Sequence, residues 1–278
     1  MVRESKGQSH LTWQQDSLYQ LQASYFTATD DWINSPGFPE YPFKRPITDE
    51  CIKCHVTFAK NNSFTGKTNT YDKGSFIYGI SCERCHGPLQ AHVDHHSNNP
   101  KDTIANSVLQ IDTLNRQLQL DVCAQCHSGL RAEQVKGNPF SYVVGEQLGD
   151  YTKNFYYGRP NANLDVHSNQ YGLLKSSACF KNTEVMTCTT CHDPHQSQRN
   201  TADYFNAKCA KCHTNSTEIH QVVFDDTPSN TNNCIECHMP VFPSETMKVH
   251  LEDEATERSI IIRTHLIGVY VDNILQNR

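Results

Sequence analysis

The sequence of 278 residues contains no apolar run of the roughly 18 residues that a transmembrane helix requires. Its most apolar piece, SIIIRTHLIGVYV at Ser259–Val271, is short and is interrupted by Arg263 and His265. The first residues, MVRESKGQSHLTW, also lack the apolar segment of a secretory signal peptide. The sequence therefore predicts no membrane-spanning helix.

Basic runs are also missing, and apolar residues are scarce. The formal net charge is −6, and no cluster of Lys and Arg follows the pattern that binds a phosphate backbone, so we expect no nucleic-acid partner. Hydrophobic residues make up only 37% of the chain, which is low for a globular protein of this length. A conventional hydrophobic core is therefore not predicted.

Cysteine and histidine, in contrast, are abundant and strongly patterned. The pattern Cys-x-x-Cys-His occurs six times and uses twelve of the thirteen cysteines. The six copies are Cys51–His55, Cys82–His86, Cys123–His127, Cys188–His192, Cys209–His213 and Cys234–His238.

Covalent haem attachment explains this pattern better than zinc or a disulfide framework. Zinc sites use paired cysteines, but tetrahedral thiolate chemistry does not require a histidine after every second cysteine. In c-type haem attachment both thiols bond to the porphyrin, and the adjacent imidazole becomes the proximal ligand of the iron. We therefore expect six haem c groups, bound covalently by Cys51, Cys54, Cys82, Cys85, Cys123, Cys126, Cys188, Cys191, Cys209, Cys212, Cys234 and Cys237. The proximal histidines are His55, His86, His127, His192, His213 and His238.

Six haems would leave about 46 residues for each, close to the size at which small domains need a metal or crosslink to fold. We therefore expect the polypeptide to wrap a chain of haems and to depend on them for folding. The expected fold class is mainly α with much irregular loop and few strands, a multihaem cytochrome c fold.

The spacing of the motifs predicts one domain without a regular repeat. Successive proximal histidines are 31, 41, 65, 21 and 25 residues apart, too uneven for a solenoid. Residues 1–50 form a haem-free N-terminal arm with a strand at Leu18–Phe26, and residues 51–278 form the hexahaem part. Helices are expected at Leu89–Ser97, Ser107–His127 and Thr201–His213. Gly137–Asn161, in the widest gap, is expected to cover haem faces.

Nine further histidines are candidates for the opposite, distal face of each iron. His195, in CTTCHDPH, is too near His192 to reach the other face of the same ring, and Pro194 turns the chain between them. We therefore expect His195 to ligate the iron of a neighbouring haem, so that the motif holds two haems together.

Five more distal ligands follow from position and setting. His92 and His96 are four residues apart on one face of a short helix, whereas His95 lies off that face and is expected to be exposed. His167 precedes a helix and His265 has an apolar setting. His10, His220 and His250 compete for the last place, and we favour His10; the Met186 and Met247 thioethers are weaker alternatives.

Cys179 is the single cysteine outside the motifs. With the other thiols bonded to haem it has no intramolecular disulfide partner, so we expect an inert, buried thiol. An intermolecular link is the alternative.

Several segments resemble a known family. GISCERCHGPLQAHV, MTCTTCHDPH, NCIECHMP and a late IRTH are similar to multihaem cytochromes of the cytochrome c-554 type, whose superfamily includes nitrite reductase and hydroxylamine oxidoreductase. The resemblance covers roughly Ile47 to the C-terminus. It implies haems in stacked and perpendicular pairs, with ligands supplied from one motif to a neighbouring haem. GQSHLTW is also similar to a segment that follows an additional N-terminal haem in larger relatives.

Closed, closely spaced haems predict electron transfer rather than catalysis. The chain lacks the Cys-x-x-Cys-Lys variant that marks the active haem of nitrite reductase, so we expect no enzyme activity. The alternative is an oxidoreductase that acts on a small nitrogen or sulfur compound at one open haem. The partners expected are redox proteins or extracellular electron acceptors, and copies of the chain could polymerise through end-to-end haem contacts. Haem is attached outside the cytoplasmic membrane, so we expect a periplasmic or extracellular protein whose export signal has been removed or truncated.

Overall fold

The structure is a computed structural model of the whole chain. It describes residues 6–39, 41, 43–63, 67–130, 132–154, 164–198, 201–214, 233–251 and 256–270. None of the helices in these ranges is long and apolar enough to cross a membrane.

Four strands near the start of the chain form a twisted antiparallel sheet. It consists of β1 (Gly7–Gln14), β2 (Ser17–Phe26), β3 (Asp31–Asn34) and β4 (Arg45–Pro46), with β2 paired to the other three. The strand predicted at 18–26 is confirmed as β2. A bulge between Ser9 and Leu11 interrupts the pairing of β1 with β2. Bulges change the direction of the side chain at the irregular position, which here belongs to His10.

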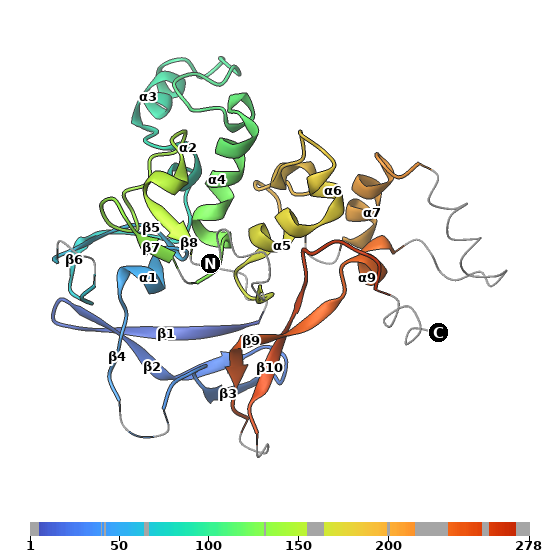
Figure 1. Cartoon of the computed structure of the whole chain (residues 1–278). Helices are drawn as coiled ribbons and strands as arrows, with labels where there is room; N and C mark the ends of the chain where they lie inside the picture. The colour runs from blue at the N-terminus through green and yellow to red at the C-terminus, as the bar shows by residue number, and fades with distance from the viewer. Residues whose placement is uncertain are drawn as a thin grey trace.

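The remaining elements lie above this sheet, with one hairpin reaching down to it (Figure 1). In chain order they include α1 (Asp49–Ile52), β5 (Val56–Asn61), β6 (Tyr71–Tyr78), α2 (Glu83–His86), α3 (Gln90–Asn98), η1 (Ile111–Thr113), α4 (Arg116–His127), β7 (Ala132–Gln134), η2 (Leu148–Asp150) and β8 (Thr152–Asn154). They continue with α5 (Gln170–Ser176), α6 (Ala178–Lys181), η3 (Cys188–Thr190), α7 (Ala202–Ala210), α9 (Cys234–His238), β9 (Val241–Val249) and β10 (Arg258–Arg263).

The hairpin of β9 and β10 joins the C-terminal part to the N-terminal sheet. A single bridge connects Asn34 to His250, and Lys6 Nζ donates a hydrogen bond of 2.8 Å to the Ile261 carbonyl. Phe26 of β2 packs in one cluster with Val249 of β9. The N-terminal sheet therefore packs against the C-terminal hairpin as part of the same fold.

The fold class agrees with the prediction only in part. The described residues contain ten strands, and the longest α-helix, α4, has only 12 residues. The prediction of few strands is therefore wrong, whereas short helices and irregular loops are present. Sequence periodicity underestimated the strands because most of them pair as isolated two-stranded hairpins, whose exposed faces carry a mixture of polar and apolar residues.

The predicted helices agree only in part. α3 matches the helix predicted at 89–97, and α7 occupies the middle of the one predicted at 201–213. The helix predicted at 107–127 begins only at Arg116, because Asn115 caps it by accepting a hydrogen bond from the Leu118 amide. Ser107, with φ of 54°, is not helical.

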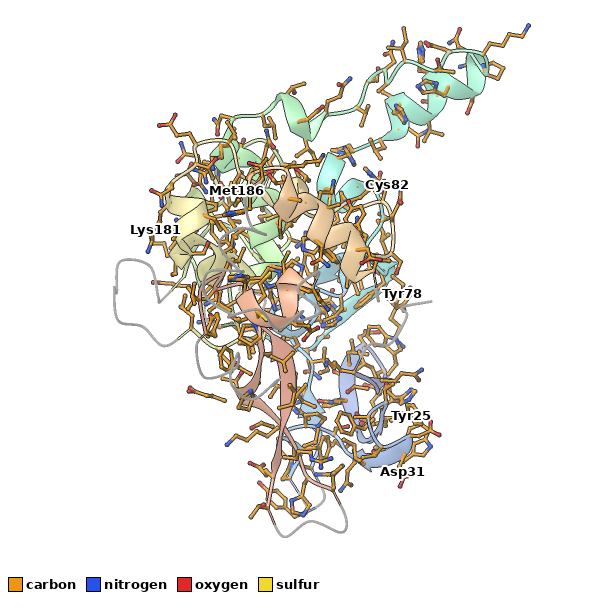
Figure 2. The ribbon with its side chains drawn as sticks, turned by 90° about the vertical axis from the view of Figure 1, so that its right-hand side faces the viewer. Tyr25, Asp31, Tyr78, Cys82, Lys181 and Met186 are labelled. Carbon is orange, nitrogen blue, oxygen red and sulfur yellow. The ribbon has the colours of Figure 1, made fainter. Side chains whose placement is uncertain are left out.

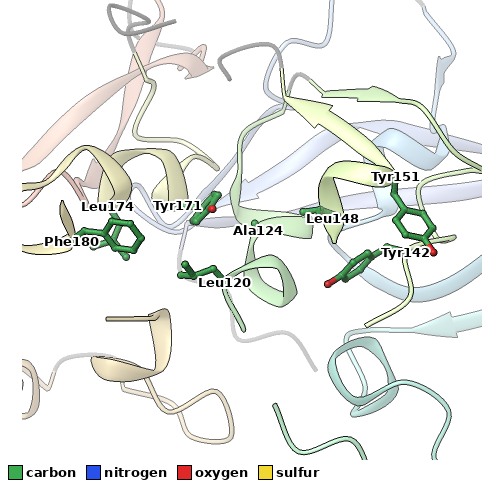
Figure 3. Packing of buried hydrophobic residues seen from close by; sticks show 8 residues of the cluster. All are labelled: Leu120, Ala124, Tyr142, Leu148, Tyr151, Tyr171, Leu174 and Phe180. Carbon is green, nitrogen blue, oxygen red and sulfur yellow. The ribbon is translucent and has the colours of Figure 1, made fainter. Parts of the chain in front are cut away.

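Three small clusters take the place of a single hydrophobic core. The largest joins α4 to α5, α6 and the segment around Tyr142–Tyr151 (Figure 3), and consists of Leu120, Ala124, Tyr142, Leu148, Tyr151, Tyr171, Leu174 and Phe180. Its members from 142–151 lie in the segment predicted to cover haem faces; they pack on α4.

Candidate haem sites

Three of the attachment motifs contain a helical turn that places their reactive groups together. In three motifs the histidine amide donates to the carbonyl of the first cysteine: His86 to Cys82 at 2.9 Å, and likewise His192 to Cys188 at 2.9 Å and His213 to Cys209 at 3.0 Å. Residues three and four apart share one face of such a turn. Both thiols and the imidazole can therefore reach one porphyrin.

The thiols of successive motifs lie next to one another. The Cys54 and Cys126 thiols are hydrogen-bonded, which raises the pKa of Cys54, and the Cys54 Sγ to Cys126 carbonyl distance is 3.7 Å. The Cys123 and Cys188 thiols form a second such pair, which raises the pKa of Cys123.

The C-terminal motifs continue the series. Burial, and then the neighbouring Cys234 thiol, raise the pKa of Cys209 to about 11. Burial, followed by the charges of Cys179 and Cys212, raises the pKa of Cys191. The cysteines of motifs one, three, four, five and six therefore form a series of neighbours, and Cys85 of motif two adjoins Cys123 and Cys126 of motif three.

His86 and His195 lie at the separation expected of two imidazoles on one iron. Their rings are nearly parallel, at 14°, with centres 6.1 Å apart. Two imidazoles bound to opposite faces of an iron, each through a nitrogen about 2 Å from the metal, place their ring centres about 6 Å apart. The His86 Nδ1 donates to the Leu109 carbonyl at 2.8 Å, which leaves Nε2 as the ligand atom. This arrangement pairs His195 with a motif other than its own.

His192 and His265 form a second opposed pair. Their ring centres are also 6.1 Å apart, with an angle of 26° between planes. Burial, and then the neighbouring histidines His192 and His127, lower the pKa of His265 to about 4. Its imidazole is therefore neutral near pH 7, the state in which a ring nitrogen can bind a metal. The Nδ1 of His265 is buried without a hydrogen-bond partner.

His167 lies close enough to His55 to interact with its charge. Burial is the main cause that lowers the pKa of His167, and His55 lowers it further. Asp165 fixes the loop: its Oδ1 accepts from the His167 amide at 3.0 Å, and its Oδ2 accepts from Ser244 Oγ at 3.0 Å and from the Thr246 amide at 2.8 Å. The carboxylate thereby ties this histidine to β9.

The three histidines of α3 have different bonding. His92 Nδ1 donates to the Asn106 carbonyl at 2.6 Å and His96 Nδ1 to the Asp102 carbonyl at 3.2 Å, so Nε2 is the available ligand atom of both. His95 instead uses Nε2 to bind Asp102 Oδ2 at 2.8 Å and is half-buried, so the prediction that it is exposed is wrong. Figure 2 shows α3 standing away from the rest of the chain, beyond the labelled Cys82.

The candidates for the last distal ligand are placed unequally. His10, at the bulge of β1, packs its ring against Trp32 with centres 5.4 Å apart, and its Nε2 is buried without a partner. His250 is exposed at the end of β9, and His220 lies outside the described residues. Met186 and Met247 pack against hydrophobic clusters. Cys179 is half-buried, with its Sγ 3.4 Å from Ser177 Oγ.

Some contributors to these sites were not predicted from the sequence. Asp165 and Asp193 each lie two residues before a candidate ligand, and each accepts a hydrogen bond from that histidine's amide; for Asp193 and His195 the distance is 2.9 Å. An Asp that bonds the backbone two residues on is a known turn, so the Asp-x-His spacing was an available signal. The carbonyl of Leu109 carries no such signal.

The donor set and its geometry fit covalently bound haem. Paired thiols share a turn with an imidazole. Two pairs of imidazoles lie at the separation expected of axial ligands. A backbone carbonyl accepts a hydrogen bond from one ring nitrogen of His86, which leaves the other nitrogen available to bind a metal. Among the residues that the structure describes, no three ligating side chains converge as in a zinc site. These features define the class: the chain is a multihaem c-type cytochrome.

Known proteins support this class. Residues 40–87 match the family of cytochrome c554 and c-prime. The chain is 27% identical over 214 residues to the multiheme cytochrome MtrA of Shewanella baltica (strain OS185). The aligned region covers 72% of this chain and 55% of MtrA. It therefore spans about half the length of this curated relative. The crystal structure of the outer cell wall cytochrome OcwA superposes on 98% of this chain and 68% of its own, with a TM-score of 0.60 and 19% identity. The predicted resemblance to multihaem cytochromes is confirmed.

Proposed function

We propose that the chain is a hexahaem electron-transfer protein whose irons are closed on both faces by histidine. The twelve motif cysteines would bind six haem c groups, and His55, His86, His127, His192, His213 and His238 would be the proximal ligands. The distal ligands proposed are His10, His92, His96, His167, His195 and His265. Residues 51–278 would hold all six haems in one domain, with residues 1–50 as its haem-free N-terminal sheet.

The observation that carries the proposal is the pairing of His86 with His195 at 6.1 Å. A haem iron with two imidazoles has no free position for a substrate and is suited to electron transfer. Each haem, when bound, supplies one iron that cycles between the ferric and ferrous states.

The order of the attachment sites supports transfer along the whole chain. Contacts between cysteines join motifs one and two to motif three, then motif three to four, four to five and five to six. Neighbouring thioether positions bring porphyrin edges close together, which electron transfer requires. The chain would therefore hold six redox centres without a gap.

The location and partners proposed follow from this function. MtrA and OcwA are named as a multiheme cytochrome and an outer cell wall cytochrome. We propose a periplasmic or extracellular location, with redox proteins or extracellular acceptors as partners. End-to-end assembly of copies would extend the series of haems, because motif six lies at one end of it.

Two measurements on the purified holoprotein test this function. The denatured protein should have the mass of the polypeptide plus six haems, because six intact motifs are present. The reduced protein should pass electrons rapidly to a soluble acceptor and show negligible turnover of nitrite or hydroxylamine. Fewer than six haems would contradict the stoichiometry, and substantial turnover would favour an oxidoreductase with an open haem.

A further inference from the structure

Arg84 is a buried positive charge inside the second attachment motif. Arg84 stands between Cys82 and Cys85 in the sequence, and the residue is only 8% exposed. Its Nε is buried and has no hydrogen-bond partner among the residues that the structure describes. In the described part of the chain no carboxylate forms an ion pair with it. Burying an unpaired guanidinium is costly, so the residue calls for a functional explanation.

The guanidinium group lies where three attachment motifs meet. Arg84 Nη2 donates to the carbonyl of Lys53, in motif one, at 3.1 Å. It also contacts the thiol of Cys126, in motif three, and helps to lower the pKa of that thiol to about 7, second to the hydrogen bond with Cys54. The Gln125 amide donates to the Arg84 carbonyl at 3.3 Å, which fixes the two motifs to one another. The group is held in place by the Phe140 ring, 5.3 Å from its central carbon.

Two other basic groups near haem motifs, Lys53 and Arg263, differ from Arg84 in their environment. Lys53 is paired with Glu50 at 2.5 Å. Arg263 donates to the carbonyls of Ile235 and Met239 beside motif six, but it also pairs with Glu236 at 2.5 Å and is partly exposed. A carboxylate and solvent screen the charge of Arg263, whereas neither screens that of Arg84.

We propose that Arg84 raises the reduction potentials of the haems attached at motifs one, two and three. The proposal rests on the proposed function, since it requires haems at these motifs. Reduction adds one electron to an iron, and a fixed positive charge in a region of low dielectric stabilises that added charge. In a partly reduced chain the haems at motifs one, two and three would then be reduced first. They would therefore accept electrons from the haems at motifs four to six.

The test is a redox titration of the holoprotein in three variants, with each haem followed by its low-spin resonance signal. In Arg84→Gln the ratio of reduced to oxidised haem, measured at a fixed potential, should fall several-fold for at most three haems. Arg84→Lys keeps the charge and should stay near the wild type. Arg263→Gln is the matched control, because it removes a charge that adjoins motif six but is screened; it should leave the potential of the haem at motif six, as well as those at motifs one to three, unchanged.

Several results would overturn the role of Arg84. These are unchanged potentials in Arg84→Gln, an equal shift of all six haems, or the same shift in Arg84→Lys. If Arg84→Gln fails to mature, the reduction potentials of the haems in the wild-type protein provide the test. The haems at motifs one to three must then have higher potentials than those at motifs five and six. The reverse order would contradict the proposal. Six low-spin haems with insensitive potentials would refute only this role, whereas missing or high-spin haems would refute the proposed function.

Discussion

A chain produced without attached haem is expected to show no cooperative unfolding transition. In the described part of the chain, most buried apolar residues fall into three small clusters, the largest of which has only eight members. Such a polypeptide buries too little apolar surface to offset the conformational entropy of folding. Binding of a cofactor that only the folded state can hold supplies the missing stability.

Thermal unfolding followed by circular dichroism, with haem-loaded protein beside it, measures this dependence. The loaded protein should melt in one sharp transition and the haem-free chain should show only a gradual change. The matched control is Cys179→Ser, which removes the thiol outside the motifs and should mature and melt like the wild type. A haem-free chain that melts cooperatively near the temperature of the loaded protein would contradict the dependence on haem.

Replacing His195 with Ala is expected to change the haem attached at Cys82 and Cys85 from low-spin to high-spin. The centres of the His86 and His195 rings are 6.1 Å apart, so under the proposed function the substitution would remove the sixth ligand of that iron. All six haems should remain attached, because the substitution alters no motif cysteine or proximal histidine.

Electron paramagnetic resonance of the oxidised protein, with the haem identified by its attachment peptide, measures the outcome. Full conversion of one haem in six is expected. His95→Ala is the control, because His95 uses its Nε2 for Asp102 and should leave every haem low-spin. A high-spin haem at Cys188 and Cys191 instead would show that His195 serves its own motif, and would refute the cross-ligation.

Local chemistry explains what the sequence could predict of the sites. The cysteine and histidine spacing of the motif favours a helical turn that brings the three side chains together, so this local geometry, seen at Cys82–His86, Cys188–His192 and Cys209–His213, could be predicted. The placement of His195 opposite a different motif also followed from a local limit, because three residues including Pro194 cannot carry an imidazole around a porphyrin.

The rest depended on contacts between distant parts of the chain. Arg84 meets Lys53 and Cys126 only after three separate motifs have come together, and no periodicity in the sequence signals this. The ligand nitrogen of His86 is selected by the carbonyl of Leu109, 23 residues away. The strands were underestimated for a similar reason: β9 and β10 form a hairpin against the N-terminal sheet, so their stability comes from tertiary pairing rather than from local propensity.

Carbon monoxide binding to the fully reduced protein tests most directly whether the chain is a closed electron carrier. Carbon monoxide needs an iron with an open or easily displaced sixth position, and paired histidines such as His192 with His265 leave none. The absorption spectrum of the reduced protein should therefore stay unchanged when carbon monoxide is added. Stoichiometric binding at even one haem would contradict this and would identify an open iron suited to a substrate.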